Sequence, residues 1–293
     1  MHTIPTDTAV QKMDRLNLRP ALDFVARHAE IYEGFVHDLM VLPSIPLKAV
    51  DAFTTLDEHL VGDSVHITGD EALEIFSRLP ASFQELSMLQ NINYHFARMI
   101  PVPVFEDTGD WKEAIEIVEE TKFPREAAKD HPHRILIGRC DGTMIFPSAL
   151  PACIHDSVRV RWMYQLHVML HEFFHTIELN RRDPAIAQKI ILRSGANLYT
   201  FHDWWQKWED LFRAPVRPLC PTRYAQTYVD ALSSETSQDE FTRALAEQVC
   251  ESFVGYIMGI VPNDEDDTSF KQHSPEAWAL MDELATSEVV EIG

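Results

Sequence analysis

The stretch from Val158 to Leu179 reads VRVRWMYQLHVMLHEFFHTIEL. It contains neither Gly nor Pro, and apolar side chains surround its polar positions, so it predicts one long helix buried inside a domain. Within it stands the pentad His171-Glu172-Phe173-Phe174-His175, which has the pattern HExxH. At about 3.6 residues per turn, the two histidines lie one above the other on a single face of the helix.

Two imidazoles in this arrangement can bind one tetrahedral zinc ion. Glu172 is rotated by about 100° from His171 around an ideal helix, which can bring its carboxylate beside the open position of the metal. From there it can take a proton from a metal-bound water. Buried histidines and a buried glutamate also need partners. The pentad therefore predicts a metal site with Glu172 as the general base.

Composition narrows the classes of function. The chain has 293 residues and a formal net charge of −21, which disfavours nucleic acids and anionic membranes as partners. Its longest apolar run, 253–261, is too short to span a bilayer. The N-terminus has no basic region followed by an apolar core, so we expect a cytoplasmic protein, although a toxin delivered by a dedicated secretion route would look the same. The four cysteines show no CxxC spacing and predict scattered, reduced thiols.

The order of the patterns predicts an α+β fold with two regions. Residues 8–42 have apolar side chains at helical intervals, and a second helix is expected between Gly69 and Pro80. We therefore expect a mainly helical N-terminal region over 1–90 and a catalytic domain over 91–293. Asp141-Gly142 stands between two apolar runs, 134–139 and 143–146, which predicts a β-hairpin just ahead of the metal helix.

A catalytic zinc ion takes three protein ligands, so the histidines need a third. The spacings HExxHxxGxxH and HExxH with a glutamate some twenty residues later both fail here. Residues 241–258 predict a second buried helix, in which Glu247 and Glu251 share one face. Buried carboxylates are costly unless a cation binds them. We therefore expect Glu247 to be the third ligand and Glu251 to orient a ligand histidine, with His202 as the fallback ligand.

Three motifs together resemble the gluzincin clan of zinc peptidases, closest to its lethal-factor-like group. They are HExxH at 171–175, the segment PTRYAQT at 221–227 and the segment EQVCESF at 247–253. The resemblance covers about 134–259 and implies a zincin-like catalytic domain that binds one Zn²⁺ ion and hydrolyses peptide or protein substrates. By the same match, Tyr224 would donate a hydrogen bond to the oxyanion that forms at the scissile carbonyl.

The chain departs from this pattern in one place. In the family the tyrosine precedes the ligand glutamate by a few residues, whereas here residues 228–245 intervene. Tyr228 is therefore an alternative to Tyr224, and the insertion could form a lid or belong to a site rebuilt for another substrate. Its acidic residues, such as Asp239 and Glu240, are expected to be solvated loop charges.

Two other functions remain open from the sequence. One is a metal-dependent biosynthetic or tailoring enzyme that acts on a small molecule, in a pocket crowded by Trp204, Trp205 and Trp208. The same tryptophans are more simply expected to fill a core. The other is a non-catalytic binding module with a structural zinc ion. The oligomeric state is not indicated by any pattern in the sequence.

Overall fold

The structure of the protein is a computed structural model. It describes residues 25–27, 30, 34, 52–54, 67, 69–89, 93–97, 100–101, 135–136, 139–140, 143–147, 157–214, 222–230, 232, 237–259 and 269–292. The predicted helical region over 8–42 lies largely outside these residues, and its described positions 25–27, 30 and 34 are helical. The predicted boundary at residue 90 stays a prediction.

The described elements combine helices with short strands, which makes the fold α+β. The strands are β1 (Ala52–Thr54), β2 (Asn93–Ala97), β3 (Ile100–Pro101), β4 (Ile135–Leu136), β5 (Arg139–Cys140), β6 (Thr143–Pro147), β7 (Ile190–Ser194), β8 (Asn197–Thr200) and β9 (Glu288–Ile292). The helices are α4 (Gly69–Phe76), α5 (Ala81–Met88), α9 (Val158–Glu178), α10 (Pro184–Ala187), α11 (Phe201–Arg213), α12 (Arg223–Asp230), α13 (Gln238–Met258), α14 (Phe270–His273) and α15 (Pro275–Ala285), with a 3₁₀ turn, η3, at Leu179–Arg181.

The chain divides into two compact units. The first comprises Met1–Glu33, Ala49–Glu74 and Asn93–Glu172, and the second comprises Gly34–Lys48, Ile75–Ile92 and Phe173–Gly293. The division falls inside α9, which is one unbroken helix, and His171 lies two positions before it. His175 and all of α13 belong to the second unit.

The first unit contains a sheet with the strand order β1-β2-β6-β5. β1 and β6 run parallel to β2, whereas β5 pairs antiparallel with β6 through the register Arg139↔Ile145 and Cys140↔Met144. The antiparallel pairing predicted around Asp141-Gly142 is therefore confirmed, but its first strand is Arg139–Cys140 and not the predicted run 134–139. The preceding apolar residues 135–136 form β4, which pairs with β3 in a separate two-stranded sheet.

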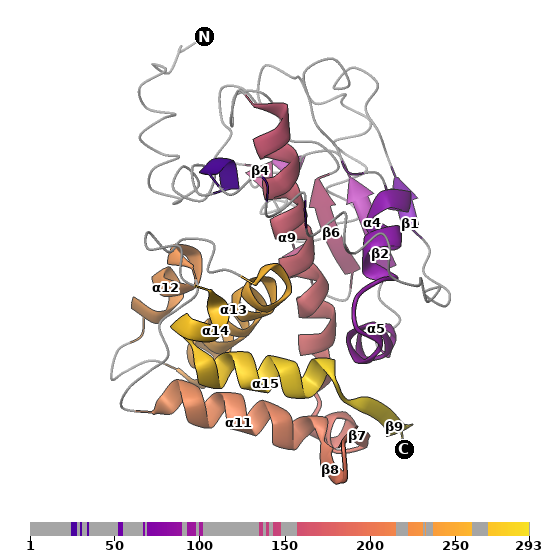
Figure 1. Ribbon diagram of the computed structural model, residues 1–293, viewed down its shortest axis with the longest axis vertical. Coiled ribbons are helices and arrows are strands. Elements are labelled where there is room, and N and C mark those ends of the chain that lie inside the picture. The colour runs from indigo at the N-terminus through magenta and orange to yellow at the C-terminus, as the bar shows by residue number, and fades with distance from the viewer. Residues whose placement is uncertain are drawn as a thin grey trace. The chain divides into compact units, whose positions relative to one another are not determined.

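In the second unit, α11 and α15 run side by side, with the antiparallel sheet β8-β7-β9 at one end (Figure 1). The indole Nε1 of Trp204 in α11 donates to the carbonyl of Leu280 in α15 at 2.8 Å. Trp204, Trp205 and Trp208 are all buried. The expectation that these tryptophans fill a core is therefore confirmed.

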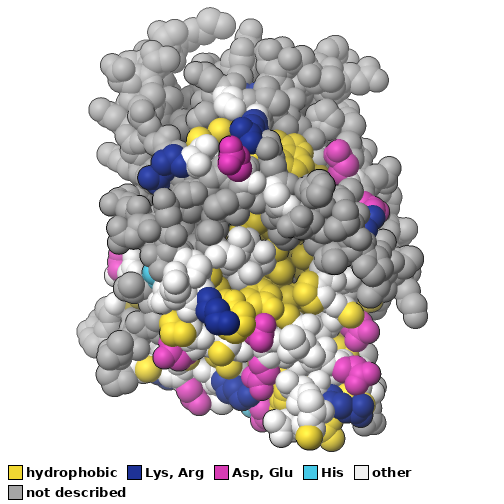
Figure 2. Space-filling view, in the orientation of Figure 1, with side chains coloured by type: hydrophobic (Ala, Val, Ile, Leu, Met, Phe, Trp, Pro, Cys, Tyr) yellow, Lys and Arg dark blue, Asp and Glu magenta, His cyan; other side chains and the backbone are white. Residues whose placement is uncertain are grey.

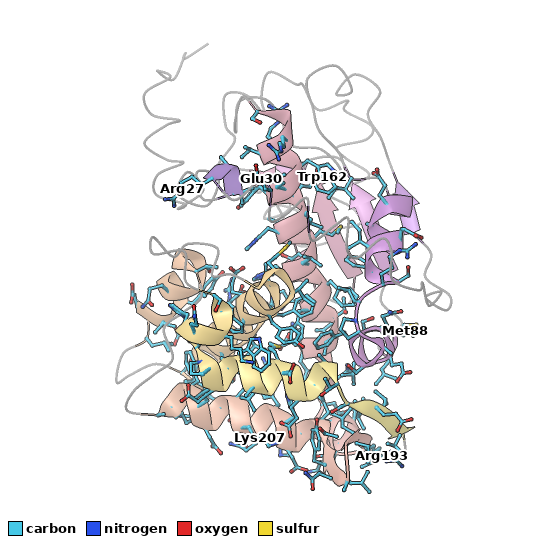
Figure 3. All side chains as sticks on the ribbon, viewed as in Figure 1. Arg27, Glu30, Met88, Trp162, Arg193 and Lys207 are labelled. Atoms are coloured by element: carbon cyan, nitrogen blue, oxygen red, sulfur yellow. The ribbon has the colours of Figure 1, made fainter. Side chains whose placement is uncertain are left out.

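The charges on the outside of this unit are mixed in sign. Lys207 of α11 and Arg193 of β7 point outward (Figure 3), and they pair with Glu283 at 2.8 Å and with Glu288 at 3.1 Å. Figure 2 shows acidic and basic side chains next to one another on this face. Exposed ion pairs of this kind contribute little to stability.

A cluster of phenylalanines joins α5, α9 and α13 within the second unit. The ring of Phe253 in α13 lies 5.1 Å from the ring of Phe83 and 4.9 Å from that of Phe174, centroid to centroid. All three side chains are fully buried. Aromatic burial of this size dominates core energetics, so the cluster fixes which face of α13 meets α9.

Among the helices that the structure describes, none combines the length and the apolar character that a bilayer crossing requires.

Candidate metal centre

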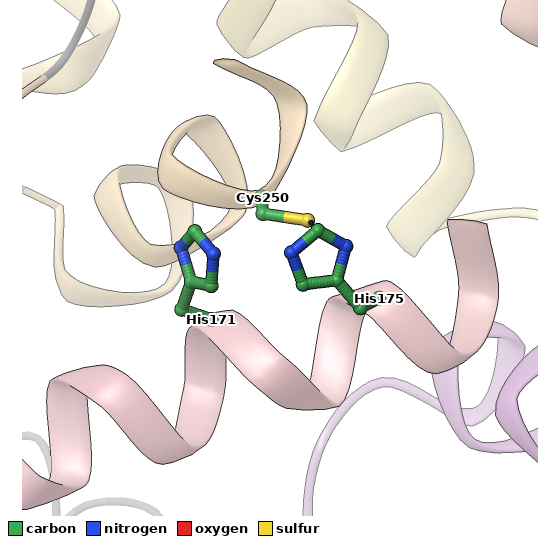
Figure 4. A group of neighbouring side chains, drawn as sticks. All are labelled: His171, His175 and Cys250. Carbon is green, nitrogen blue, oxygen red and sulfur yellow. Dashed lines mark hydrogen bonds between the residues drawn. The ribbon is translucent and has the colours of Figure 1, made fainter. Parts of the chain in front are cut away.

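Helix α9 carries the histidine pair as the sequence predicts. Its bounds, Val158–Glu178, match the predicted stretch to within one residue. His171 and Glu172 are buried, at 5 % and 7 % exposure, and His175 is partly buried. The two imidazole rings project from the same side of α9 (Figure 4), as their spacing of four residues requires.

Helix α13 faces this pair with a cysteine. One ligand atom each from His171, His175 and Cys250 lie within 4.8 Å of one another, and Figure 4 shows the thiol of Cys250 directed toward the His175 ring. The Sγ atom of Cys250 is 3.4 Å from Nδ1 of His175, and Cys250 is fully buried. Two imidazoles and a thiol are typical donors to zinc.

Glu247 approaches His175 from the other ring nitrogen. Its Oε2 atom lies 3.8 Å from Nε2 of His175, and the carboxylate is largely buried. Glu247 stands three residues before Cys250 on α13, so both side chains come from one face of that helix. The structure therefore brings two acidic groups of α13 to opposite nitrogens of one imidazole.

Glu178, one turn after His175, adds a third acidic group. Its Oε2 atom is 3.7 Å from Nδ1 of His175, and its Oε1 atom is 2.5 Å from the guanidinium of Arg181. Burial acts to raise the pKa of Glu178, but the bond to His175 and the charges of Arg181 and Arg182 outweigh burial and hold that pKa below its usual range. Glu178 is therefore an anion within the core.

The surroundings of His175 favour a positive charge. Burial acts to lower the pKa of its ring, but the negative charge of the Cys250 thiolate and the bonds to Cys250, Glu178 and Glu247 more than compensate and raise the pKa well above its usual range. A divalent cation would satisfy the same negative groups. The chemistry of the donors thus fits a metal ion.

The other predicted site residues are placed less completely. Glu251 is buried on α13, at 2 % exposure, and its predicted role in orienting a histidine stays a prediction. Tyr224 lies in α12, but its side chain is outside the described residues. Tyr228, on the same helix, is partly buried, and the guanidinium of Arg243 lies 5.2 Å from its ring centroid. Which tyrosine faces the metal stays a prediction.

The inserted segment is more helical than the sequence suggests. Helix α13 begins at Gln238, three residues before the predicted start, so Asp239 and Glu240 belong to its first turn and not to a loop. They are exposed, as expected. The carboxylate of Glu240 accepts from the backbone of Ser237, while the Ser237 hydroxyl accepts from the Glu240 amide. This capping box explains why so polar a turn is helical.

The sequence did not lead us to expect Cys250 and Glu178 at the site, although the position of each in the chain indicates that it lies near the histidines. Cys250 stands between Glu247 and Glu251 on a helix already predicted to face the histidines, and Glu178 follows His175 by three residues. A search for paired cysteines could not find Cys250, because its partners are histidines on another helix. His202, the fallback ligand, lies in α11 and is not part of the His171, His175 and Cys250 group.

Comparison of the chain with protein-family models, with curated proteins and with solved structures gives no match.

Proposed function

We propose that this protein is a metal-dependent hydrolase that uses one divalent ion, zinc in the first instance, to cleave peptide bonds. The observation that carries the proposal is the convergence of two imidazoles and a thiol within 4.8 Å, with a buried glutamate immediately after His171 in the chain. A zincin-like architecture is part of the same proposal. The peptide class of the substrate rests on the three motifs that resemble gluzincin peptidases.

Each residue of the site has a separate role in the proposed reaction. His171 and His175 would hold the ion, together with a third ligand from α13, where both Glu247 and Cys250 approach His175. When bound, a zinc ion lowers the pKa of its water ligand toward about 7. Glu172 would act as the general base, accepting a proton from the attacking water and passing it to the leaving amine. A tyrosine of α12, Tyr224 or Tyr228, donates a hydrogen bond to the oxyanion.

Replacing the base tests the proposal most directly. Glu172→Gln keeps the size and polarity of the side chain but cannot accept the proton. We expect it to retain the metal stoichiometry of the wild type and to lose about 10²–10⁴-fold in turnover of a peptide library. Equal turnover in the two proteins would contradict the proposal. Absence of any peptide cleavage by the metal-loaded wild type would favour an enzyme acting on small molecules.

A structural metal site is the second candidate. It is favoured by one observation, namely that α13 brings two acidic groups to His175, because four protein ligands would leave no position for water. In that case removal of the metal would lower the stability of the protein, and the loaded wild type would hydrolyse no substrate. The presence of Glu172 beside the histidines argues against this candidate, since a structural site has no use for a base.

A further inference from the structure

The two acidic groups of α13 meet different nitrogens of the His175 ring. Cys250 lies at Nδ1 and Glu247 lies at Nε2. The lone pairs of these nitrogens point away from each other, so one ion bound to one nitrogen of this ring cannot be shared equally by both groups. In the observed orientation of the ring, one of these two groups can bind the ion, and the other can only bind the second nitrogen of His175 and so orient the ring.

The distances favour the thiol as the ligand. Two atoms bound to one tetrahedral zinc ion, at about 2.3 Å for sulfur and about 2.0–2.1 Å for nitrogen, lie roughly 3.5 Å apart. Cys250 Sγ is 3.4 Å from Nδ1 of His175. Cys250 also belongs to the compact group with His171, whose ligand atoms all lie within 4.8 Å. Glu247 is not part of this group.

Glu178 is the other acidic side chain on the Nδ1 side, at 3.7 Å. Its Oε1 atom is already bound to Arg181 at 2.5 Å, and Arg182 lies 3.7 Å from its Oε2 atom. A carboxylate neutralised by two guanidinium groups has little charge left to offer a metal ion.

We propose that Cys250 binds the metal ion as a thiolate, as the third protein ligand beside His171 and His175, and that Glu247 orients His175 through its other ring nitrogen. The proposal rests on the metal-dependent function proposed above and deepens it. Three protein ligands would leave one position of the ion for water, which is the arrangement of catalytic zinc sites. Metal-binding histidines commonly give their second nitrogen to a carboxylate, which is the part assigned to Glu247.

A thiolate ligand also sets the preference of the site among metal ions. Thiolates favour borderline and soft ions such as zinc, cobalt and cadmium, whereas a carboxylate as the third ligand would be more tolerant of a hard ion such as manganese. We therefore expect the wild type to bind zinc and cobalt in preference to manganese.

Cobalt substitution of the full chain tests the ligand assignment without any measurement of activity. The protein is stripped with a chelator and titrated with Co²⁺. A cysteine ligand gives an intense thiolate-to-cobalt charge-transfer band in the near ultraviolet, which carboxylate and imidazole ligands do not give. We expect one equivalent of Co²⁺ and this band in the wild type. In Cys250→Ser the band disappears and cobalt affinity falls at least about a hundredfold.

Two further variants make the assignment selective. Cys140→Ser, on strand β5, is the matched control and should keep the band. Glu247→Gln should also keep the band, with cobalt affinity reduced by about 10–100-fold, because it removes an orienting partner and not a ligand. Circular dichroism checks that each variant is folded. The cobalt spectrum of the wild type tests the ligand assignment even if a variant does not fold.

The outcomes separate this inference from the proposed function. Cobalt binding without the band in the wild type, together with loss of the metal in Glu247→Gln, would overturn the role of Cys250. If hydrolysis that depends on Glu172 persisted in that case, the proposed function would stand. A wild type that binds no divalent ion would overturn both.

Discussion

The sulfur of Cys250 lies 3.4 Å from Nδ1 of His175, although the two residues are 75 positions apart in the chain. The contact joins the metal helix α9 to α13, and the packed phenylalanines of α5, α9 and α13 hold the two helices against each other. Nothing in either helix alone requires the pairing. The site is therefore a product of the core that lies beneath it.

Removing an imidazole should remove the metal and its stabilising effect. For a ligand that binds only the folded state, saturation at 100 times the dissociation constant adds about 2.7 kcal/mol to the free energy of unfolding. We expect zinc at this excess to stabilise the stripped wild type by about that amount, measured by denaturant titration. His171→Ala should show no zinc-dependent shift. His202→Ala is the control: zinc should stabilise it by as much as it stabilises the wild type, because His202 lies outside the site.

Phe253→Ala should destabilise the protein by about 3–5 kcal/mol, because it deletes a fully buried ring that touches Phe83 and Phe174. It should also weaken metal binding, since α13 loses its fixed position against α9. Phe201→Ala is the control. Phe201 is equally buried but stacks on Trp204 in α11. Comparable loss of stability with unchanged metal affinity is expected there, by chemical denaturation and metal titration. Equal metal affinity in both variants would contradict the role of the phenylalanine cluster.

One tyrosine of α12 should matter for turnover and the other should not. Deleting the hydroxyl that stabilises the oxyanion is expected to lower kcat by about 10²–10³-fold with little change in KM. Tyr224→Phe and Tyr228→Phe, compared side by side on the same peptide substrate, identify that residue. Tyr228 already packs against Arg243, so we expect Tyr224→Phe to be the inactive variant. Full activity in both would remove the tyrosine from the mechanism.

The capping box at the start of α11 should give a stability difference that depends on pH. The backbone and hydroxyl of Thr200 donate to the carboxylate of Asp203 and lower its pKa. Because the folded pKa is the lower one, the contribution of Asp203 is present above the unfolded value of about 3.9 and is lost as the pH falls through the folded value. Thr200→Ala should cost about 0.5–2 kcal/mol at pH 7. Replacing Asp203 with alanine should cost less stability at pH 2 than at pH 7, as measured by denaturant titration at the two pH values.

Much of the local structure could be predicted from the sequence. The apolar stretch around HExxH and the apolar helix that contains Glu247 were both predicted, as was the hairpin at Asp141-Gly142. These features depend on periodicity and on turn chemistry, which act over a few residues. The predicted start of α13 lies three residues after the observed one, because the first turn is polar. That turn is stabilised by the side chains of Ser237 and Glu240 and not by burial.

The sheet of the second unit shows where prediction stops. β7 pairs with β9 through registers such as Arg193↔Glu288, between strands nearly a hundred residues apart. No local pattern specifies such a partner, since each strand alone offers only an alternating surface. Gly195 adopts a positive φ of 59° in the turn between β7 and β8. The sequence around this turn does not indicate that β9 is the third strand of the sheet.

The sequence by itself determined that two histidines share a face of a buried helix, because the rise and twist of an α-helix are fixed by its backbone hydrogen bonds. Only the tertiary structure decided which groups of α13 meet them. Glu247, Cys250 and Glu251 lie on the same face of that helix. The rotation of α13 that places Cys250 at Nδ1 and Glu247 at Nε2 of His175 comes from aromatic packing elsewhere. Packing acts between distant segments and is therefore invisible to local periodicity.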